Sequence, residues 1–153
     1  MKQKKYFMEI KILSEKLYEE YDSFLLENEN NLFYASVKYL LFLEKILECK
    51  SYVLIVLVNN SIVGCLPLMY KDGKLGRVYN SLPFYGSNGG IICDNKEAQK
   101  LLIDKYNKII SEDNVLASNY IENPLNKCSI KNLIIYNEKD SRIGQFTPLL
   151  LDN

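Results

Sequence analysis

Residues 85–90 of the chain, YGSNGG, hold three of its seven glycines within five positions. Glycines allow a tight backbone fold and let N–H groups approach a ligand, and the start of a following helix adds partial positive charge. Together these features suit a phosphate or a carboxylate. The stretch is not a Walker A motif, because no Lys-Ser/Thr pair follows it, and it does not have the position of a dinucleotide fingerprint. Two interpretations stay open, a structural turn and a ligand-binding loop formed by Tyr85, Gly86, Ser87, Asn88, Gly89 and Gly90.

Histidine is absent from the chain, and this limits the acid–base chemistry that it offers. The absence excludes Ser-His-Asp and Cys-His nucleophile systems and argues against most zinc and iron sites. General acids and bases must then come from Asp, Glu, Tyr, Lys, a chain terminus or water. The four cysteines, at positions 49, 65, 93 and 128, are widely and irregularly spaced. We therefore expect free thiols and no metal site.

Arg77 and Arg142 are the only arginines of the chain. A guanidinium group binds phosphate through a planar fork that lysine lacks, so Arg77 is a candidate substrate-binding residue. The alternative for each arginine is a solvated surface position or a structural ion pair.

Composition limits the partners that we expect. The chain has 19 basic and 19 acidic residues, whereas a nucleic-acid binder usually carries a basic excess. Its longest apolar run, 52–58, is too short to span a bilayer, and no signal-peptide pattern is present. We expect a cytoplasmic protein with no membrane partner, folded as one domain over residues 1–153.

Helical periodicity predicts three helices, each introduced by a capping residue. We expect Ser14 and Ser36 to cap the first two helices, which end near positions 27 and 48. Asp94 is expected to cap the third, with Glu97 completing a capping box. The second helix has the broadest apolar face and must pack on a large surface such as a sheet. That face is formed by Tyr39, Leu40, Phe42, Leu43, Ile46 and Leu47.

Apolar runs predict strands between the helices and after them. The three central strands are expected to form an antiparallel meander, with a turn at Asn59-Asn60, a ladder break at Pro67 and a second turn at 71–74. This pattern predicts a mixed α/β or α+β domain, with a central, mostly antiparallel sheet flanked by helices. The predicted strands are 6–13, 52–58, 61–70, 75–82, 115–123 and one within 131–140.

The order of these elements resembles the GNAT fold of N-acetyltransferases: strand, two helices, three antiparallel strands, phosphate loop, helix and strand. More specifically, about residues 33–148 resemble the Fem-like (FemAB) acyl and aminoacyl transferases. Fem-like chains usually contain two GNAT-like halves, and this chain resembles the first; the acyl donor is expected to bind in the second. The stretches that carry the resemblance are FYASVKYLLFLEKIL, IVGCLPLMYKDGKLGRVYNSLPFYGSNGGIICD, ASNYIENP and RIGQFTPL, of which PFYGSNGG is the most specific.

The resemblance implies that an acceptor amine attacks an acyl thioester or an aminoacyl ester, while a backbone N–H polarises the carbonyl. The implied donor is acetyl-CoA or another acyl donor, with aminoacyl-tRNA as one form of it. The implied acceptor is an amine such as a cell-envelope sugar or peptide precursor. The glycine-rich loop would contact the donor, and the helix start at Tyr34 and Ser36 would face the acceptor. Where the last strand splays from its neighbour, Glu122 would act as base and Tyr120 as acid.

Each of these roles has a structural alternative. Tyr34 and Ser36 also suit a core-edge aromatic and a helix cap, and Tyr120 and Glu122 also suit a solvated strand end. For the whole chain, the alternative is a non-catalytic ligand-binding or interaction module that needs a partner subunit. That partner would be a second GNAT-like half or another copy of the chain.

Overall fold

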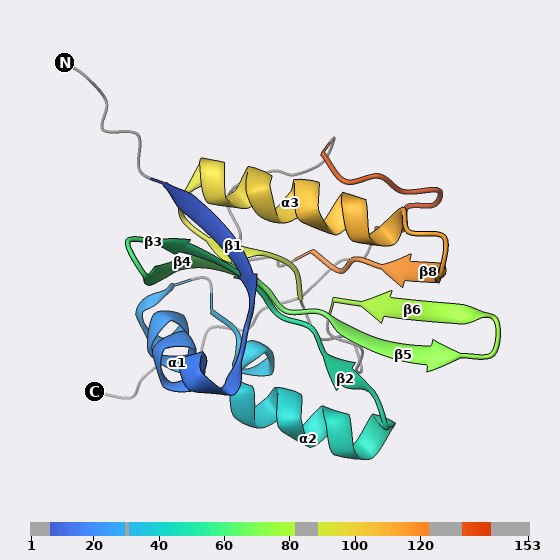
Figure 1. Cartoon of the computed structure of the whole chain (residues 1–153), viewed down its shortest axis with the longest axis horizontal. Helices are drawn as coiled ribbons and strands as arrows, with labels where there is room; N and C mark the ends of the chain where they lie inside the picture. The colour runs from blue at the N-terminus through green and yellow to red at the C-terminus, as the bar shows by residue number, and fades with distance from the viewer. Residues whose placement is uncertain (1–6, 30, 82–88, 123–132, 142–153) are drawn as a thin grey trace, which may run out of the picture.

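Two four-stranded sheets and three α-helices make up the part of the chain that the computed structural model describes, residues 7–29, 31–81, 89–122 and 133–141. Figure 1 shows the sheets between α3 on one side and α1 and α2 on the other. The prediction of a mixed fold with mostly antiparallel strands is confirmed, since one described strand pair alone is parallel.

The first sheet has the strand order β1-β3-β4-β7 and is antiparallel throughout. Its strands are β1 (Met8–Ile12), β3 (Leu54–Val58), β4 (Ser61–Leu66) and β7 (Ile92–Cys93). The second sheet has the order β2-β5-β6-β8, and its β6–β8 pair is parallel, because a helix lies between these two strands in the sequence. Its strands are β2 (Lys50–Ser51), β5 (Met69–Gly73), β6 (Gly76–Asn80) and β8 (Val115–Asn119).

The two sheets share long, interrupted strands. The chain passes from β4 into β5 across Pro67 and Leu68, and the ladder breaks there as predicted, because proline has no N–H to donate. A backbone hydrogen bond from Tyr52 N–H to the Leu68 carbonyl, at 2.7 Å, connects the chain after β2 to this break. β2 and β3 are likewise separated by two residues only.

The facing strand is interrupted at the same place by an insertion. Met69 pairs with Asn80 and Cys65 pairs with Ile92. A step of four positions on one strand therefore faces a step of twelve on the other, so the second strand has eight more residues between these two pairs. The glycine-rich stretch lies within this insertion.

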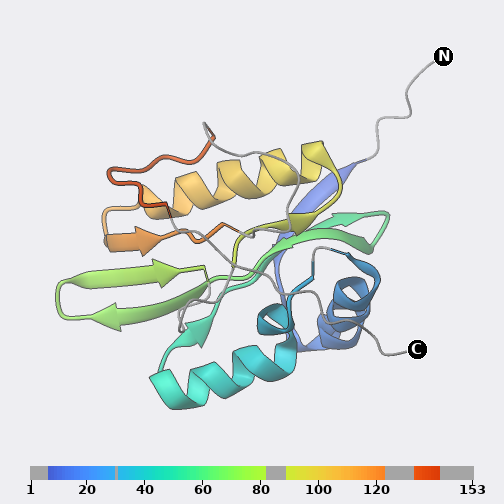
Figure 2. The same ribbon diagram turned by 180° about the vertical axis from the view of Figure 1, so that it is seen from behind.

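Two hydrophobic clusters lie on opposite faces of β3. Ile55 and Leu57 belong to the cluster under α1 (Tyr18–Glu27) and α2 (Val37–Leu47), whereas Leu54 and Val56 belong to the cluster under α3 (Lys96–Ile110). Figures 1 and 2 show the two helical layers on either side of the strands. β3 is therefore covered on both faces, as its unbroken apolar sequence suggests.

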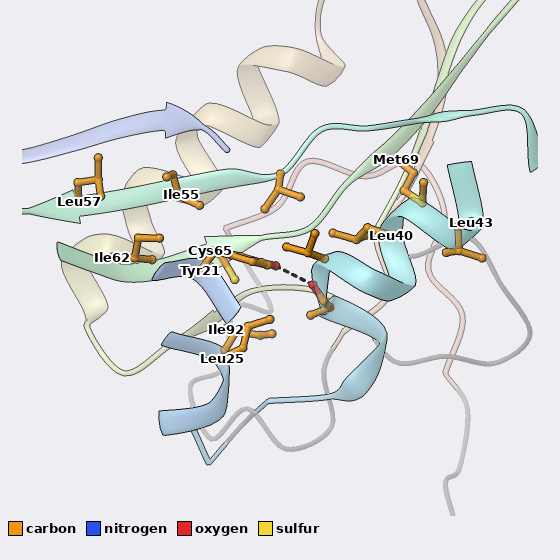
Figure 3. Close-up of a cluster of buried hydrophobic side chains, with 13 residues drawn as sticks. Tyr21, Leu25, Leu40, Leu43, Ile55, Leu57, Ile62, Cys65, Met69 and Ile92 are labelled. Carbon is orange, nitrogen blue, oxygen red and sulfur yellow. Dashed lines mark hydrogen bonds between the residues drawn. The ribbon is translucent and has the colours of Figure 1, made fainter. Parts of the chain in front are cut away.

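Tyr21 lies at the centre of the first cluster (Figure 3). It is fully buried, and its hydroxyl donates to the Ala35 carbonyl at 2.9 Å, so its polar atom is satisfied. Ala35 ends the 3₁₀ helix η2 (Phe33–Ala35), and this bond therefore fixes the entry into α2.

The predicted cap of the second helix is confirmed, because Ser36 Oγ accepts from the Tyr39 N–H at 3.4 Å. The Ser14 cap is wrong. Ser14 makes no side-chain cap bond and precedes a 3₁₀ helix, η1 (Glu15–Leu17), after which α1 begins.

The predicted Asp94 cap of the third helix is also wrong. Asn95 caps α3 instead, and its Oδ1 accepts from the N–H groups of Glu97 at 2.8 Å and Ala98 at 3.1 Å. Asp94 accepts from Asn28 Nδ2 at 3.2 Å, next to the end of α1. Both residue types suit a cap, and the tertiary contact with Asn28 is what separates their roles.

Two further strand predictions need correction. The second hairpin turn lies at 74–75 rather than at 71–74, with Asp72 and Gly73 paired inside the ladder. The described part of the last predicted strand, 133–140, forms no strand. There Asn107 of α3 donates to the Leu133 carbonyl at 2.8 Å and accepts from the Ile135 N–H at 3.1 Å. The Asn107 side chain thus makes two backbone hydrogen bonds of the kind that a neighbouring strand would make.

Within the ranges described, no helix combines the length and the apolar character that a membrane crossing requires.

Candidate functional site

The candidate site lies at the end of the described pairing between the parallel strands β6 and β8. Ser81 N–H still donates to the Asn119 carbonyl at 3.0 Å, as in a regular ladder. The next two hydrogen bonds between these segments use the Ser81 side chain. Its Oγ accepts from the Ile121 N–H at 2.7 Å and donates to the Ile121 carbonyl at 3.4 Å. A buried side chain thus holds the two segments together beyond the last described main-chain bond between them. We call Ser81, Gly89, Gly90, Ile91, Tyr120 and Ile121 the strand junction.

The two glycines of the junction are required by its geometry. A Cβ at position 89 would lie 2.1 Å from the Ser81 carbonyl oxygen, far inside van der Waals contact. Gly90 has φ of +83°, a backbone conformation that other residues rarely adopt. Gly89 and Gly90 therefore let the backbone pack against the end of β6 and continue into β7.

Tyr120 joins the two sides of the junction. Its hydroxyl oxygen accepts from the Ile91 N–H at 3.2 Å, and Ile91 is fully buried. The ring of Tyr120 packs against Tyr106 of α3, with centroids 5.4 Å apart, and the Tyr106 hydroxyl bonds Ser118 Oγ at 2.5 Å. The Tyr120 ring is therefore supported by a second tyrosine that is itself anchored to β8.

Burial raises the pKa of Tyr120 above its ordinary value of 10.0, and the charge of nearby Glu122 raises it further. The phenol is therefore protonated at neutral pH and keeps a proton that it can donate. The junction places this hydroxyl beside a buried backbone N–H, and two such donors suit an oxygen on which negative charge develops.

The predicted site residues fall into three places. Gly89, Gly90 and Tyr120 meet at the junction, and Glu122, which is exposed, lies two positions beyond Tyr120. The remaining loop residues Tyr85, Gly86, Ser87 and Asn88 lie outside the described residues.

Tyr34 and Ser36 lie in the other helical layer. Ser36 caps α2, while Tyr34 is 37% exposed and packs edge-to-face on Phe33 and Tyr39. Their neighbours Ala35 and Val37 belong to the cluster opposite the one on which Tyr120 packs. No described contact brings Tyr34 or Ser36 to the junction.

The guanidinium group of Arg77 makes its contacts within the second sheet. Its Nε and Nη2 donate to Asp72 at 2.7 and 3.1 Å, and its guanidinium lies 4.0 Å from the centre of the Tyr70 ring. The hydrogen bond from Arg77 lowers the pKa of the Asp72 carboxyl. Arg77 therefore closes the β5–β6 hairpin as a structural ion pair, the alternative named for it above.

Sequence reasoning missed three contributors to the junction: Ser81, Tyr106 and Ser118. Ser81 carries a usable signal, since it is a small polar residue that ends a strand just before the glycine-rich insertion. Tyr106 and Ser118 carry none, because a tyrosine on an apolar helix face and a serine in a strand are ordinary residues until the fold pairs them.

Neither of the cavities found in the described structure lies at the junction. No cluster of three or more His, Cys, Asp or Glu side chains suited to a metal ion occurs among the described residues. Two cavities found in the described structure lie elsewhere. One of about 20 Å³ is next to α2 at Val37 and Leu40, and one of about 130 Å³ is near the β3–β4 turn at Asn59 and Asn60.

Comparisons of the chain with protein-family models, with curated proteins and with solved structures found no match.

Proposed function

We propose that this chain is a GNAT-like domain of the Fem-like kind that takes part in acyl or aminoacyl transfer to an amine. The proposed donor is acetyl-CoA or another acyl donor, and the proposed acceptor is an amine-bearing small molecule such as a cell-envelope precursor. The proposal rests on the sequence resemblance and on features of the fold that suit this chemistry.

The arrangement of the strands supports the proposal. If β2–β3, β4–β5 and β6–β7 are each taken as one interrupted strand, five strands follow one another across the sheets in chain order. The first pairings are antiparallel and the last is parallel, with two helices before the meander and one before the final strand. This is the order that the resemblance implies.

The single observation that carries the proposal is the hydrogen bond from the Ile91 N–H to the Tyr120 hydroxyl at 3.2 Å, which lies beside the end of the described β6–β8 pairing. A backbone N–H at such a point suits the polarisation of an acyl carbonyl, with Tyr120 as proton donor to the departing group. Glu122, exposed and nearby, is the proposed base for the acceptor amine.

The test is a thermal-shift titration of the purified chain with acetyl-CoA and, separately, with UDP-linked amino sugars. A ligand of the native state at 100 times its dissociation constant adds about 2.7 kcal/mol to the free energy of unfolding. We expect acetyl-CoA to raise the melting temperature. Stabilisation by the sugar nucleotide alone would indicate an acceptor-binding half, and stabilisation by neither ligand would remove the proposed function.

The role of Glu122 is tested by transfer of the acetyl group to an amine, followed by mass spectrometry. Glu122→Gln should slow transfer without changing the shift that acetyl-CoA produces, because the base acts on the acceptor. Glu112→Gln, an exposed acid after the far end of α3, is the matched control. Equal rates for both variants would contradict the assignment of Glu122.

A non-catalytic interaction module is the second candidate, and one observation favours it. The predicted inward face of α2 is partly wrong, because Phe42 and Ile46 are exposed, next to exposed Phe33 and Leu41. Size-exclusion chromatography over a range of concentrations distinguishes the candidates. Concentration-dependent association favours the module, and a constant monomer favours a self-sufficient domain.

A further inference from the structure

We propose that two copies of this chain associate edge to edge, through antiparallel pairing of β1 with β1 of the second copy about a two-fold axis at Ile10. The pairing joins the first sheets of the two copies into one continuous sheet across a symmetric dimer. The inference goes beyond the proposed function, because it concerns an interaction surface and requires no acyl donor.

β1 is an edge strand of the first sheet. It pairs with β3 on one side, and no described strand pairs with its other side. Figure 1 shows β1 at the front of the molecule, with no other described helix or strand drawn across it. An open strand edge presents a row of unpaired N–H and C=O groups, and these groups can pair with a strand of another chain.

The bonding of β1 to β3 decides which backbone groups point to the open edge. The Leu13 N–H donates to the Val53 carbonyl at 2.8 Å, in the same register as the pairs of β1 with β3. In an antiparallel pair, residues that bond the neighbouring strand alternate with residues whose backbone groups point away from it. The N–H and C=O groups of Met8, Ile10 and Ile12 therefore point to the open edge.

The charges of β1 select one register for the pairing of two copies. Glu9 and Lys11 stand on either side of Ile10 and point to the same face of the sheet. A two-fold axis at Ile10 places Glu9 of each copy opposite Lys11 of the other, and opposite charges in this position stabilise paired strands. An axis at Glu9 or at Lys11 would place like charges opposite each other. Charge complementarity therefore favours the axis at Ile10.

The same register also satisfies the open backbone edge. Ile10 faces Ile10 of the second copy, and Met8 faces Ile12 of the second copy, so the outward groups of these residues form hydrogen-bonded pairs. Glu9 and Lys11 then form the non-hydrogen-bonded pairs, in which the side chains lie closer together. Backbone bonding and side-chain charge thus require the same register.

Charged side chains on an edge strand, lysine above all, often prevent such pairing. In β1 the Lys11 Nζ lies 2.8 Å from a carboxylate oxygen of Glu9, and both side chains are 45% exposed. These two charges cancel, and a second copy presents them in the reverse order. The pairing also covers apolar surface, because Ile12, which is 49% exposed, comes to lie beside Met8 of the second copy.

The interface is small, since β1 has five residues. Permanent dimers usually bury more surface than one pair of short strands. We therefore expect a dimer that dissociates on dilution, and sedimentation velocity over a wide range of concentrations measures it. The average mass should rise with concentration from the 17.8 kDa of one chain toward twice that value.

An exchange of charges tests the register. Glu9→Lys and Lys11→Glu each place like charges opposite each other in the homodimer, and each should weaken self-association roughly tenfold or more. A mixture of the two variants restores opposite charges at both positions, so it should associate as the wild type does. Both side chains are nearly half exposed and their ion pair contributes little to folding, so both variants should fold.

Two further variants serve as controls. Glu112→Lys makes the same change of charge at an exposed position after α3 and should leave self-association unchanged. Phe42→Ser alters a separate apolar surface, the exposed residues of α2, and should also leave it unchanged.

Loss of association in each charge variant, with recovery in their mixture, supports the pairing of β1. A wild-type chain that stays monomeric at every concentration overturns it, and so does association that the charge variants leave unchanged. Association that is lost in Phe42→Ser and kept in both charge variants overturns it as well, and favours the interaction module with its surface on α2.

Hydrogen exchange of the wild-type chain decides if a charge variant does not fold. Slower exchange in 8–12 at high concentration than at low concentration supports the pairing, and equal exchange overturns it. None of these measurements uses acetyl-CoA, so the proposed transfer activity and the dimer can fail separately. Association through β1 leaves the choice between the two candidate functions to the acetyl-CoA titration.

Discussion

Single residues decide the geometry of the strand junction, and Gly89 is the clearest case. The carbonyl oxygen, the carbonyl carbon and the hydroxyl oxygen of Ser81 leave no space for a side chain at position 89. The same serine holds Ile121, after β8, through two hydrogen bonds. One close contact therefore fixes three segments of the chain relative to one another.

We expect Gly89→Ala to lower the free energy of unfolding by roughly 1–3 kcal/mol, because a methyl group forced into a packed site moves the backbone. Urea denaturation measures this effect. Gly73→Ala is the matched control, since its Cβ would lie 3.4 Å from the Gly76 carbonyl oxygen, an ordinary contact, and its position is exposed. Equal stability of the two variants would contradict the close approach of Gly89 to Ser81.

The buried thiol of Cys65 should make the protein less stable at alkaline pH. Burial raises the pKa of its thiol to about 12, against about 8.5 for a cysteine in an unfolded chain. Below pH 8.5 both states hold the proton, whereas between these two values only the unfolded state loses it. Stability should therefore decline as pH rises through this window, by about 1 kcal/mol between pH 7.5 and 9.5.

The measurement is urea unfolding of wild type and Cys65→Ala at both pH values. The variant starts less stable, because a buried side chain is truncated, but its decline with pH should be smaller. The same decline in both proteins would mean that other groups titrate. Tyr21, which contacts Cys65, has a pKa raised well above its ordinary value of 10.0, so its own contribution to the decline comes mainly as pH passes 10.0, above the two pH values compared.

At the scale of elements, α3 shows how a helix start is fixed by its surroundings. Asn95 and Asp94 are neighbouring short polar residues, and each has a side-chain oxygen that can cap a helix. Asp94 bonds the end of α1, which leaves Asn95 to satisfy two free N–H groups of α3. The same α3 carries the second hydrophobic cluster, so its start also positions Tyr106 under Tyr120.

Asn95→Ala should lower the free energy of unfolding by about 1 kcal/mol, the usual cost of a lost N-cap. Ser14→Ala is the control at a helix start, and it should change stability by less than about 0.5 kcal/mol, because Ser14 makes no cap bond. Thermal and urea unfolding measure both variants. A larger effect at Ser14 than at Asn95 would contradict the cap assignment.

At the scale of the whole molecule, stability should be graded from β3 outward. β3 pairs with β1 and with β4, and its residues face a helical layer on each side. Segment 133–141 is mostly exposed and lies along α3 (Figure 1), where the Asn107 side chain makes two hydrogen bonds to it. The entire core stabilises β3, whereas local contacts stabilise segment 133–141.

Hydrogen exchange followed by mass spectrometry tests this gradient. We expect the slowest exchange in β3, at the rate of global unfolding, and fast exchange in 133–141. Asn107→Ala should speed exchange at Ile135, whose N–H loses its acceptor, and leave β3 unchanged. Equal protection of the two regions, or an unchanged rate at Ile135, would contradict this picture.

Local signals were sufficient for much of the fold. The Asn59-Asn60 turn was predictable because both residues tolerate the positive φ that a tight hairpin requires, and both adopt it. The Pro67 break, the Ser36 cap and the mixed, mostly antiparallel class follow equally from residue chemistry. Two of the predictions that failed, at Asp94 and in 133–140, concern polar atoms whose partners lie far away in the sequence. The other two, at Ser14 and 71–74, failed over the exact start of a helix and the exact position of a hairpin turn.

The sequence by itself determined the apolar core, the order of the elements and the concentration of glycines, because burial and backbone freedom are properties of single residues and their spacing. Only the tertiary structure decided that Gly89 meets Ser81, that Tyr120 reaches the Ile91 N–H and that Arg77 is bound to Asp72. The third contact is set by the register of the β5–β6 hairpin. The first two need distant chain segments to be brought into a register that the pairing of β4 with β7 and of β6 with β8 sets. Such long-range registers depend on the packing of the whole core, which no local pattern encodes.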